Sequence, residues 1–490
     1  MATTDSVGPD KGHINATSIG ILSDNVLLEI FVCYRKTGDQ SPYCTWKWHL
    51  LVHVCRRWRQ IIFASPRRLD LQLLCTYTTP SRKIMSIWPT IPVIFLGYAV
   101  FGRIDDDSAI AVLEHPDRVS RIRLFGNESQ LLKITALMQE PFPVLTHLSI
   151  SSQFRNILPL PDGLLGGSAP SLQQLNLGNV LYPALPTLLL SACNLVDLRL
   201  HNILPTGYIS PEAMVSHVST SPKLETLYIQ FKDPPSFSNL INSPPLTRTI
   251  FPALRIFSFI GKCEYLEDCV SRIDTPQLNY LFVCYQSENI NFDVPQLSKF
   301  INRSENLKRS LSRHCKITVD QDPDVLQDIV TFCLGRTTSE RRNHRPGISV
   351  CLETGIKEKI LHLTNILGFI FPILSDVVHC TIYSDNPASS SEPEGRDDFD
   401  WLQLLRQLSS LQTLIVFGNV TCLISQALAR VDVGTITEIL PALQLLCLEG
   451  SEEGQAISVH KFLAVRWDSG HPVTFVKTKE EFEEKLKSHP

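Results

Sequence analysis

A short apolar motif recurs along most of this chain and restricts its fold more than any other feature of the sequence. The motif places apolar residues at its first, fourth and sixth positions. Clear copies of the motif begin at Leu145, Leu172, Leu195, Leu224, Leu254, Leu278, Leu411 and Leu443. The starts from Leu145 to Leu278 lie 27, 23, 29, 30 and 24 residues apart, by subtraction. Sequence periods of roughly 20–30 residues indicate a repeat protein in which each repeat is one structural unit.

Each copy of the motif predicts a β-strand with one apolar face. The fourth and sixth residues lie two apart, so both side chains point to the same side of a strand. A single repeat cannot bury that side, and neighbouring repeats must stack to form a continuous core. This spacing and pattern are those of leucine-rich repeats. We therefore expect an α/β fold, an irregular leucine-rich-repeat solenoid over 119–470 with a parallel sheet on its concave face.

The repeats are irregular, and the irregularities predict loops and breaks. The asparagine usual three positions after the third apolar residue is replaced by Val180 in one repeat and by Ile203 in the next, so we do not assume an asparagine ladder. Loops are expected at 233–252 and 384–398, because both segments are polar and rich in Pro or Ser. The motif fits worst over 301–382. The strand candidates there are Cys315–Val319, Ile348–Leu352 and Val377–Tyr383.

Two short amphipathic helices are predicted ahead of the repeats. The first begins after Ser23, which can cap a helix, and carries apolar residues at helical spacing. The second is expected to run from Trp46 to about Phe63, because Pro66 biases the residue before it away from helical geometry. The pair carries more apolar residues than so small a unit can bury. This surplus favours an apolar face that is kept for a partner protein.

The helix pair resembles an F-box, the module by which substrate receptors dock onto a Skp-type adaptor in cullin–RING ubiquitin ligases. Leu22–Phe31 and Val54–Arg59 carry the core pattern. The stretch Trp46–Leu71 is similar to the version common in mushroom-forming fungi, where F-box proteins often continue into irregular leucine-rich repeats. The chain departs from the pattern at Ser23, where a proline is usual, and in its longer connection between the helices. The resemblance is strong for the helix pair and rests on the repeat period beyond it.

The resemblance implies a substrate receptor without catalytic residues, whose F-box binds the adaptor and whose repeats bind a target protein. The positions that match the adaptor-binding motif are Leu22, Val26, Leu27, Ile30, Phe31, Val54, Cys55 and Trp58. Some of these side chains must form the core of the module itself. We favour Leu22, Val26 and Leu27 as adaptor contacts and Trp58 as a core residue. The alternative function is a leucine-rich-repeat scaffold that binds proteins outside any ubiquitin ligase.

Target-binding residues are expected between the inward-facing apolar residues of each strand, because these positions point to the concave face. The early repeats place polar residues there, whereas the later ones place more apolar and aromatic residues. Aromatic anchors dominate the energetics of many interfaces. The candidates are Arg199, Tyr228, Tyr280 and Phe282. The alternative is that they are ordinary exposed strand residues.

Charge and hydropathy exclude several other partners. A net charge of −4 creates no field that attracts nucleic acid or an anionic membrane. A basic run lacks stacking aromatic residues, so we expect a solvated face rather than a nucleic-acid site; it comprises Arg56, Arg57, Arg59, Arg67 and Arg68. Apolar stretches such as 92–101 are much shorter than the roughly 20 residues that cross a bilayer. We expect a soluble protein of the cytoplasm, the nucleus or both.

Metal, cofactor and catalytic motifs are not expected in this chain. None of the 14 cysteines belongs to a C-x-x-C pair, which favours reduced core thiols over zinc ligands. His49 and His53 lie one helical turn apart but have no obvious third ligand. No phosphate-binding loop or nucleophile elbow is present, and Asp105–Asp107 are expected to be hydrated acids. We therefore predict no enzyme activity and no cofactor.

The remaining domain boundaries follow from these segments. They are a loose tail over 1–20, the helical module over 21–75, a linking segment and N-terminal cap over 76–118, and a C-terminal cap over 471–490. In the last of these, Val473–Val476 is expected to close the sheet, and a charged helix over 479–487 is expected to begin after Thr478.

Overall fold

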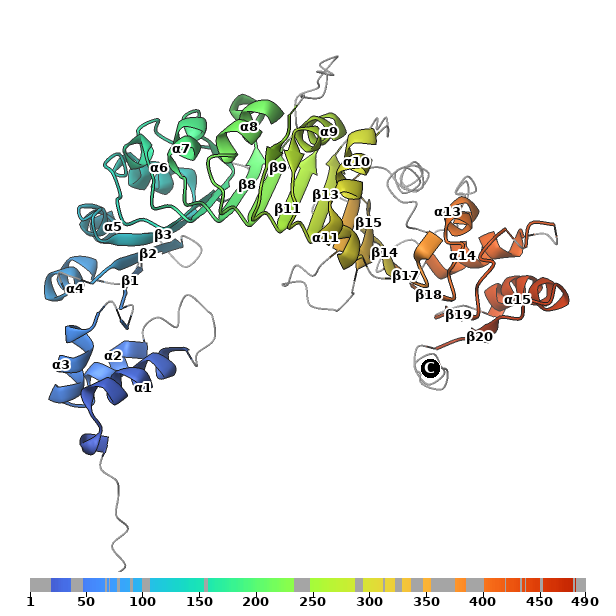
Figure 1. Ribbon diagram of the computed structural model, residues 1–490, viewed down its shortest axis with the longest axis horizontal. Coiled ribbons are helices and arrows are strands. Elements are labelled where there is room, and N and C mark those ends of the chain that lie inside the picture. The colour runs from blue at the N-terminus through green and yellow to red at the C-terminus, as the bar shows by residue number, and fades with distance from the viewer. Residues whose placement is uncertain are drawn as a thin grey trace, which may run out of the picture.

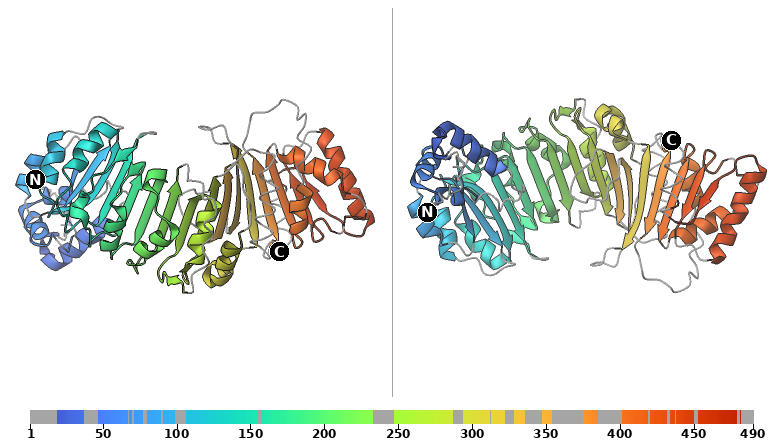
Figure 2. Two further views of the ribbon diagram at one scale, coloured as in Figure 1. Left: turned by 90° about the horizontal axis from the view of Figure 1, so that it is seen from above. Right: turned by 90° about the horizontal axis from the view of Figure 1, so that it is seen from below.

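One curved β-sheet runs along most of the molecule, and helices cover its outer side while strands line its inner side (Figure 1). The structure is a computed structural model. It describes residues 19–481 except 37–46, 67, 70, 77–79, 89–90, 99–105, 154–156, 233–246, 287–293, 312, 322–327, 336–346, 354–374, 385–400, 419, 432–433, 437, 450–452 and 479–480. The sheet contains 16 described strands. Figure 2 shows them side by side along the long axis. The predicted α/β class with a large parallel sheet is confirmed.

In its described residues, the N-terminal module comprises three α-helices rather than two. They follow a short 3-10 turn at Ile19–Ile21 and are α1 (Asp24–Lys36), α2 (Lys47–Val52) and α3 (Arg56–Ala64). Ser23 caps α1 as expected, since its Oγ lies 3.4 Å from the Val26 N that donates to it. The prediction of one helix from 46 to 63 is wrong. Cys55 has an extended backbone (φ −158°, ψ 170°), and its Sγ accepts a hydrogen bond from Trp58 N, so a new helix starts there.

The strands predicted from the clear repeats between Leu145 and Val283 are all present. They are β4 (His147–Ser152), β6 (Gln174–Gly178), β8 (Asp197–Ile203), β9 (Thr226–Phe231), β11 (Ile256–Gly261) and β13 (Tyr280–Gln286). They pair in parallel and in chain order. The apolar motif residues are buried and share one hydrophobic cluster, which is the stacked core that the repeat period predicts.

The sheet begins earlier than the sequence indicates. Before β3 (Val119–Gly126), it already contains β1 (Leu73–Thr76) and β2 (Val93–Tyr98). The segment 76–118, predicted as a linking segment and N-terminal cap, thus contributes β2 to the same sheet, which extends upstream of the predicted start at residue 119. The reason is that β1 and β2 are short and buried, and β2 reads as a continuous apolar run without the leucine spacing of the motif.

Helices and short turns connect the strands on the outer side of the sheet (Figure 1). The α-helices up to β14 are α4 (Ser81–Ile87), α5 (Asp106–Leu113), α6 (Glu128–Ala136), α7 (Leu185–Ser191), α8 (Pro211–Val218), α9 (Cys263–Ser271), α10 (Pro295–Arg303) and α11 (Glu305–Ser310). At α8, Ser210 Oγ accepts a hydrogen bond from Ala213 N at 3.2 Å and Pro211 is the first helical residue, as predicted. The remaining short elements are β5 (Leu158–Pro159), the 3-10 turn Leu164–Gly167, β7 (Val180–Leu181), the 3-10 turn Pro205–Gly207, β10 (Thr249–Ile250) and β12 (Ile273–Asp274).

Two asparagines form a short ladder that the sequence reading missed. Asn202 Nδ2 donates to Asn179 Oδ1 at 3.0 Å, and Asn179 Nδ2 donates to Ser152 O at 3.3 Å. Both asparagines have a positive φ, 54° and 53°, which asparagine tolerates better than most residues. They stand one position before Val180 and Ile203, where the motif places its asparagine. The ladder therefore exists with a one-residue offset.

The sheet changes direction in the region of poorest motif fit. The three predicted strands are present as β14 (His314–Gln321), β16 (Gly347–Glu353) and β17 (His379–Ser384). An additional strand, β15 (Asp328–Gly335), pairs antiparallel with both β14 and β16. The spatial order is β13-β16-β15-β14-β17, so the sheet is mixed here rather than parallel.

The C-terminal part returns to parallel pairing. Its elements are α13 (Trp401–Gln407), β18 (Thr413–Gly418), α14 (Val420–Ala429), β19 (Leu445–Leu448), α15 (Glu453–Asp468) and β20 (Thr474–Val476). The predicted closing strand is confirmed as β20, which pairs with β19. Residues 1–18 of the predicted tail over 1–20, 233–246 and 385–398 of the predicted loops, and all of the predicted helix over 479–487 except Glu481 lie outside the described residues. The described end of the loop predicted over 233–252 instead contains the short strand β10. At the described end, Thr478 Oγ1 accepts a hydrogen bond from Glu481 N at 3.3 Å, as a helix cap does.

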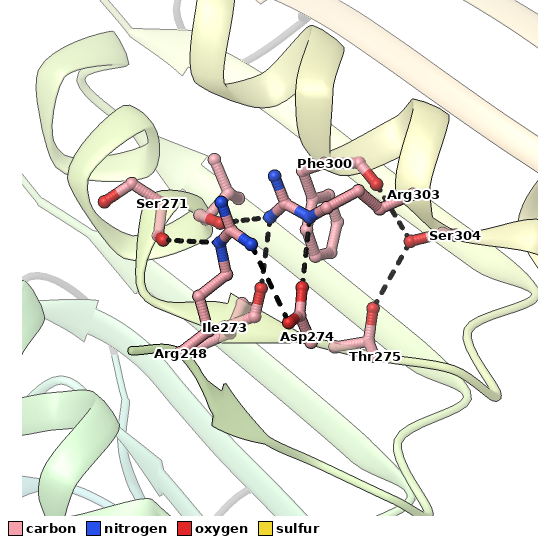
Figure 3. Close-up of polar contacts among 9 residues, drawn as sticks. Arg248, Ser271, Ile273, Asp274, Thr275, Phe300, Arg303 and Ser304 are labelled. Atoms are coloured by element: carbon pink, nitrogen blue, oxygen red, sulfur yellow. Dashed lines mark hydrogen bonds and ion pairs between the residues drawn. The ribbon is translucent and has the colours of Figure 1, made fainter. Parts of the chain in front are cut away.

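An ion-pair cluster holds β10, β12 and α10 together on the outer side (Figure 3). Asp274 lies between two arginines, with Arg303 Nε donating to its Oδ1 at 3.0 Å and Arg248 Nη1 4.0 Å from its Oδ2. Arg303 also donates to the carbonyls of Val270 and Ile273. These contacts fix α10 against the preceding repeat, and they explain the cluster as structural.

Candidate interaction surfaces

The N-terminal module divides its predicted contact residues between a core and a surface. Leu27 and Phe31 are 0% and 1% exposed, so they lie inside the module and are not accessible to a partner. By contrast Val26, Ile30 and Val54 are 45%, 39% and 58% exposed. The preference for Leu27 as a contact is therefore wrong. The reason is that consecutive helical residues point about 100° apart, which puts Leu27 on the buried side of α1 and Val26 beside it on the outer side.

The other predicted contacts of the module occupy intermediate places. Leu22 and Trp58 are partly buried and pack against the main hydrophobic cluster. Cys55 is exposed, and its Sγ serves as the cap of α3. The favoured role of Trp58 in the core agrees with its ring, whose centroid lies 4.7 Å from that of Phe31.

Exposed apolar residues on α1 and α2 form what we call the module's apolar face: Val26 and Ile30 on α1, with Leu50 and Val54 at and after the end of α2. Val26 and Ile30 are four residues apart within α1, the spacing that brings helical side chains to one side. Leu50 is 64% exposed and was missed by the sequence reading. Its spacing from Val54 is no helical signal, because α2 ends at Val52.

Salt bridges and hydrogen bonds hold the three helices together without using the apolar face. Arg57 on α3 reaches the start of α1, where Nη2 donates to Leu22 O at 2.6 Å and lies 2.7 Å from Asp24 Oδ1. Arg68 pairs with Glu29. Part of the basic run is thus occupied by contacts within the module. These ion pairs and hydrogen bonds leave the side chains of the apolar face exposed.

An aromatic contact joins the module to the sheet. Trp48 of α2 donates its Nε1 hydrogen bond to Gln72 O, directly before β1, at 3.1 Å. Phe63 of α3 stacks on Trp88, which follows α4, with ring centroids 4.4 Å apart. Trp48 approaches both rings edge-on. These contacts link the helices of the module to the first repeat of the sheet.

The predicted target-binding residues lie on the inner face of the sheet. Arg199, Tyr228 and Phe282 occupy one row across it, in which Arg199 pairs with Tyr228 and Ser258 stands between Tyr228 and Phe282. Tyr280 belongs to the neighbouring row, two residues earlier on β13. All four side chains are half-buried. The structure therefore brings Arg199 and Tyr228 together and places the other two beyond an intervening strand.

Arg199 and Tyr228 belong to a polar cluster that the sequence reading identified only in part. Tyr228 donates its hydroxyl hydrogen bond to Gln230 Oε1 at 3.1 Å, and its ring centroid lies 4.3 Å from that of His201. Arg199 Nε donates to Asp197 Oδ1 at 2.9 Å. Burial lowers the pKa of His201 below its usual range, with a further contribution from Arg199, so the ring is neutral at pH 7.

Two further features bear on the classes of site. Within the residues that the structure describes, no group of three or more His, Cys, Asp or Glu side chains could hold a metal ion. In the same residues, no helix combines the length and hydropathy that crossing a membrane requires.

Comparison with known proteins gives no assignment. No protein-family model matches the sequence, and the search of curated proteins found no match. Among solved structures, the chain is similar to the crystal structure of the Rad7 and Elc1 complex from yeast, at 11% identity over 94% of this chain and 94% of that chain. The TM-score is 0.31, too low for this likeness to support an inference about fold or function.

Proposed function

We propose that this protein is a substrate receptor of a cullin–RING ubiquitin ligase in the cytoplasm or nucleus. In this proposal the N-terminal module is an F-box that docks a Skp-type adaptor, and the curved sheet is a leucine-rich-repeat solenoid whose inner face binds a target protein. The observation that carries the proposal is the apolar face of α1 and α2. Its side chains are exposed, whereas Leu27, Leu28 and Phe31 on the same helix α1 are buried.

The position of the module relative to the sheet supports a two-ended role. Trp48, Phe63 and Trp88 connect the adaptor-binding end to the first repeat through ring contacts. A receptor that is joined to its ligase in this way holds the target at a restricted distance from the conjugating enzyme. Such proximity raises the effective concentration of the target, and the chemistry of ubiquitin transfer is supplied by other subunits.

Co-purification with a Skp-type adaptor tests the proposal. The wild-type chain is expected to capture the adaptor, and the double substitution Val26→Asp with Ile30→Asp is expected to abolish capture, because both carboxylates would be desolvated in the interface. The matched control is Leu190→Asp, an equally exposed leucine on α7 in the sheet domain. Failure of the wild-type chain to bind the adaptor contradicts the proposal.

A protein-interaction scaffold outside any ligase is the second candidate. The inner-face cluster around Tyr228 favours it, because that cluster could bind a protein without help from the module. The two candidates differ in one measurable respect. A scaffold captures a target through its inner face and shows no adaptor binding, whereas a receptor captures both.

A further inference from the structure

A pocket of about 410 Å³ opens where the first strands of the sheet begin. It lies beside the link to the N-terminal module, since Gln72, whose carbonyl accepts the Trp48 hydrogen bond, forms part of its wall. Arg121 of β3 and His147 of β4 line it from the inner face of the sheet, and the two residues are partners in the β3–β4 register. Neither residue belongs to the predicted target-binding set.

Arg121 places a positive charge in this pocket, and no acidic side chain of the described structure pairs with it. Its Nε is buried and has no hydrogen-bond partner. Within the described part of the chain, Arg121 also forms no ion pair with an acidic side chain. A buried guanidinium nitrogen without a hydrogen-bond partner is costly in a folded protein.

The other charges of the pocket are accounted for. Arg118 donates to the carbonyl oxygens of Met85, Trp88 and Ile91, which fixes its guanidinium at the end of α4. Asp117 is the only acidic side chain in the described lining, and its charge acts on Arg118. With Arg118 and Asp117 offsetting each other, Arg121 leaves the pocket with a positive charge.

The hydrogen bonds of Thr146 fix the tautomer of His147. The Thr146 hydroxyl donates its single hydrogen to Ser120 O at 2.9 Å, so its oxygen can only accept from His147 Nδ1, which lies 2.8 Å away. The proton of the neutral ring is therefore on Nδ1, and Nε2 is free to take up a second proton. Burial and the neighbouring Arg121 lower the pKa of His147 to about 4, so the ring is neutral at pH 7 while the pocket is empty.

We propose that this pocket binds an oxyanion through the guanidinium of Arg121, beside the ring of His147. In the receptor the oxyanion is the carboxylate or phosphate of a side chain on the bound target, a reading that rests on the proposed function. Arg121 offers guanidinium hydrogen bonds to two oxygens, as arginine does with carboxylates and phosphates. The negative charge of the bound anion raises the proton affinity of the neighbouring His147 ring, so the pKa of His147 reports on binding.

Nuclear magnetic resonance of the histidine rings tests the pocket on the full chain. Inorganic phosphate and acetate are the two probes, and chloride at equal ionic strength is the reference. We expect a probe to raise the pKa of His147 by about one unit or more, equivalent to about tenfold in proton affinity. A response to phosphate alone assigns a phosphate site, and a response to acetate assigns a carboxylate site. No response to either probe, or an equal response to chloride, overturns the proposal.

Substitutions at Arg121 separate binding from general charge effects. Arg121→Gln is expected to raise the pKa of His147 in the absence of probe, because the repelling cation is gone, and to remove the further rise on adding probe. Arg121→Lys keeps the charge without the paired donors and is expected to respond more weakly than wild type. The matched control is Arg123→Gln, two residues along β3 and outside the pocket, which is expected to behave as wild type. An unchanged response in Arg121→Gln overturns the proposal.

Adaptor capture by the same wild-type protein distinguishes this inference from the proposed function. A probe response without adaptor capture supports the pocket and contradicts the receptor role. Adaptor capture without a probe response contradicts the pocket alone.

Discussion

The N-terminal module and the inner face of the sheet differ in the kind of side chain that each exposes. The module completes a core around Leu27 and Phe31 and leaves apolar residues such as Val26 exposed beside them. The inner face instead pairs its functional groups with each other, as Tyr228 does with Gln230 and Arg199 does with Asp197. A surplus apolar face suits one constant partner that buries it. A surface of polar and aromatic groups that already bond to one another suits partners that are selected by matching polar contacts.

The largest expected effect comes from placing a charge in the core of the module. Leu27→Asp should destabilise the module by about 3–5 kcal/mol, because an unpaired carboxylate would replace a fully buried leucine. Chemical denaturation followed by tryptophan fluorescence measures the loss. Val26→Asp on its own is the comparison and should change stability by about 0.5 kcal/mol or less. Equal losses for the two variants would contradict the division of α1 into a buried and an exposed side.

The second effect concerns the link between the two regions. Trp88→Ala should cost about 2 kcal/mol, since it removes the ring that stacks on Phe63 and meets Trp48 edge-on, although Trp88 itself is partly exposed. Limited proteolysis should then cut between the module and the sheet faster than in wild type. Trp467→Ala is the control, because that tryptophan is exposed at the opposite end. An unchanged cleavage rate would show that the aromatic contact does not hold the module to the sheet.

A smaller effect is expected from pH on the inner face. The pKa of His147 is lowered to about 4 in the folded chain, whereas the unfolded chain has an ordinary value near 6.5. The unfolded chain therefore binds more protons between these values, and stability falls as pH drops from about 6.5 to about 4. His147→Gln should remove about 1 kcal/mol of that loss, less than the full shift because solvent reaches the ring. Denaturation curves at several pH values measure it, and identical pH profiles would contradict the predicted burial of His147.

The smallest effect belongs to the Tyr228 cluster. Tyr228→Phe removes the hydrogen bond to Gln230 and leaves the ring packed beside His201, so we expect a loss of about 0.5–1 kcal/mol. Thermal unfolding detects a change of this size. Target affinity should fall by more than stability does if the hydroxyl also contacts the target. A fall in stability with no change in target affinity would make the cluster structural.

The sequence predicts the parallel part of the sheet because each repeat contains the apolar motif within its own residues. Leu175 and Leu198, for example, are two rungs of one core and can be recognised without knowledge of their neighbours. The motif does not predict the strand order where that order depends on pairing between strands. β15 carries no leucine spacing, and its antiparallel place between β14 and β16 appears only in the pairing of the three strands.

The candidate sites are less predictable than the fold for a related reason. A residue pattern that predicts a helix does not show which side of the helix is buried. Leu27 and Val26 are both apolar residues of α1, although Leu27 is buried and Val26 is exposed. Long-range partners are equally hidden. Trp48 and Trp88 lie forty residues apart by subtraction, and the pairing of Arg121 with His147 appears only once β3 and β4 are in register.

The affinity of the intact chain for a Skp-type adaptor tests the central claim most directly. Calorimetric titration should show that the wild-type chain binds, and that Val26→Asp combined with Ile30→Asp weakens binding at least about 100-fold, the equivalent of about 2.7 kcal/mol. Leu190→Asp should bind as wild type does. Absence of binding by the wild-type chain, or equal binding by the double variant with its fold intact, would contradict the assignment of the apolar face as the adaptor-docking surface.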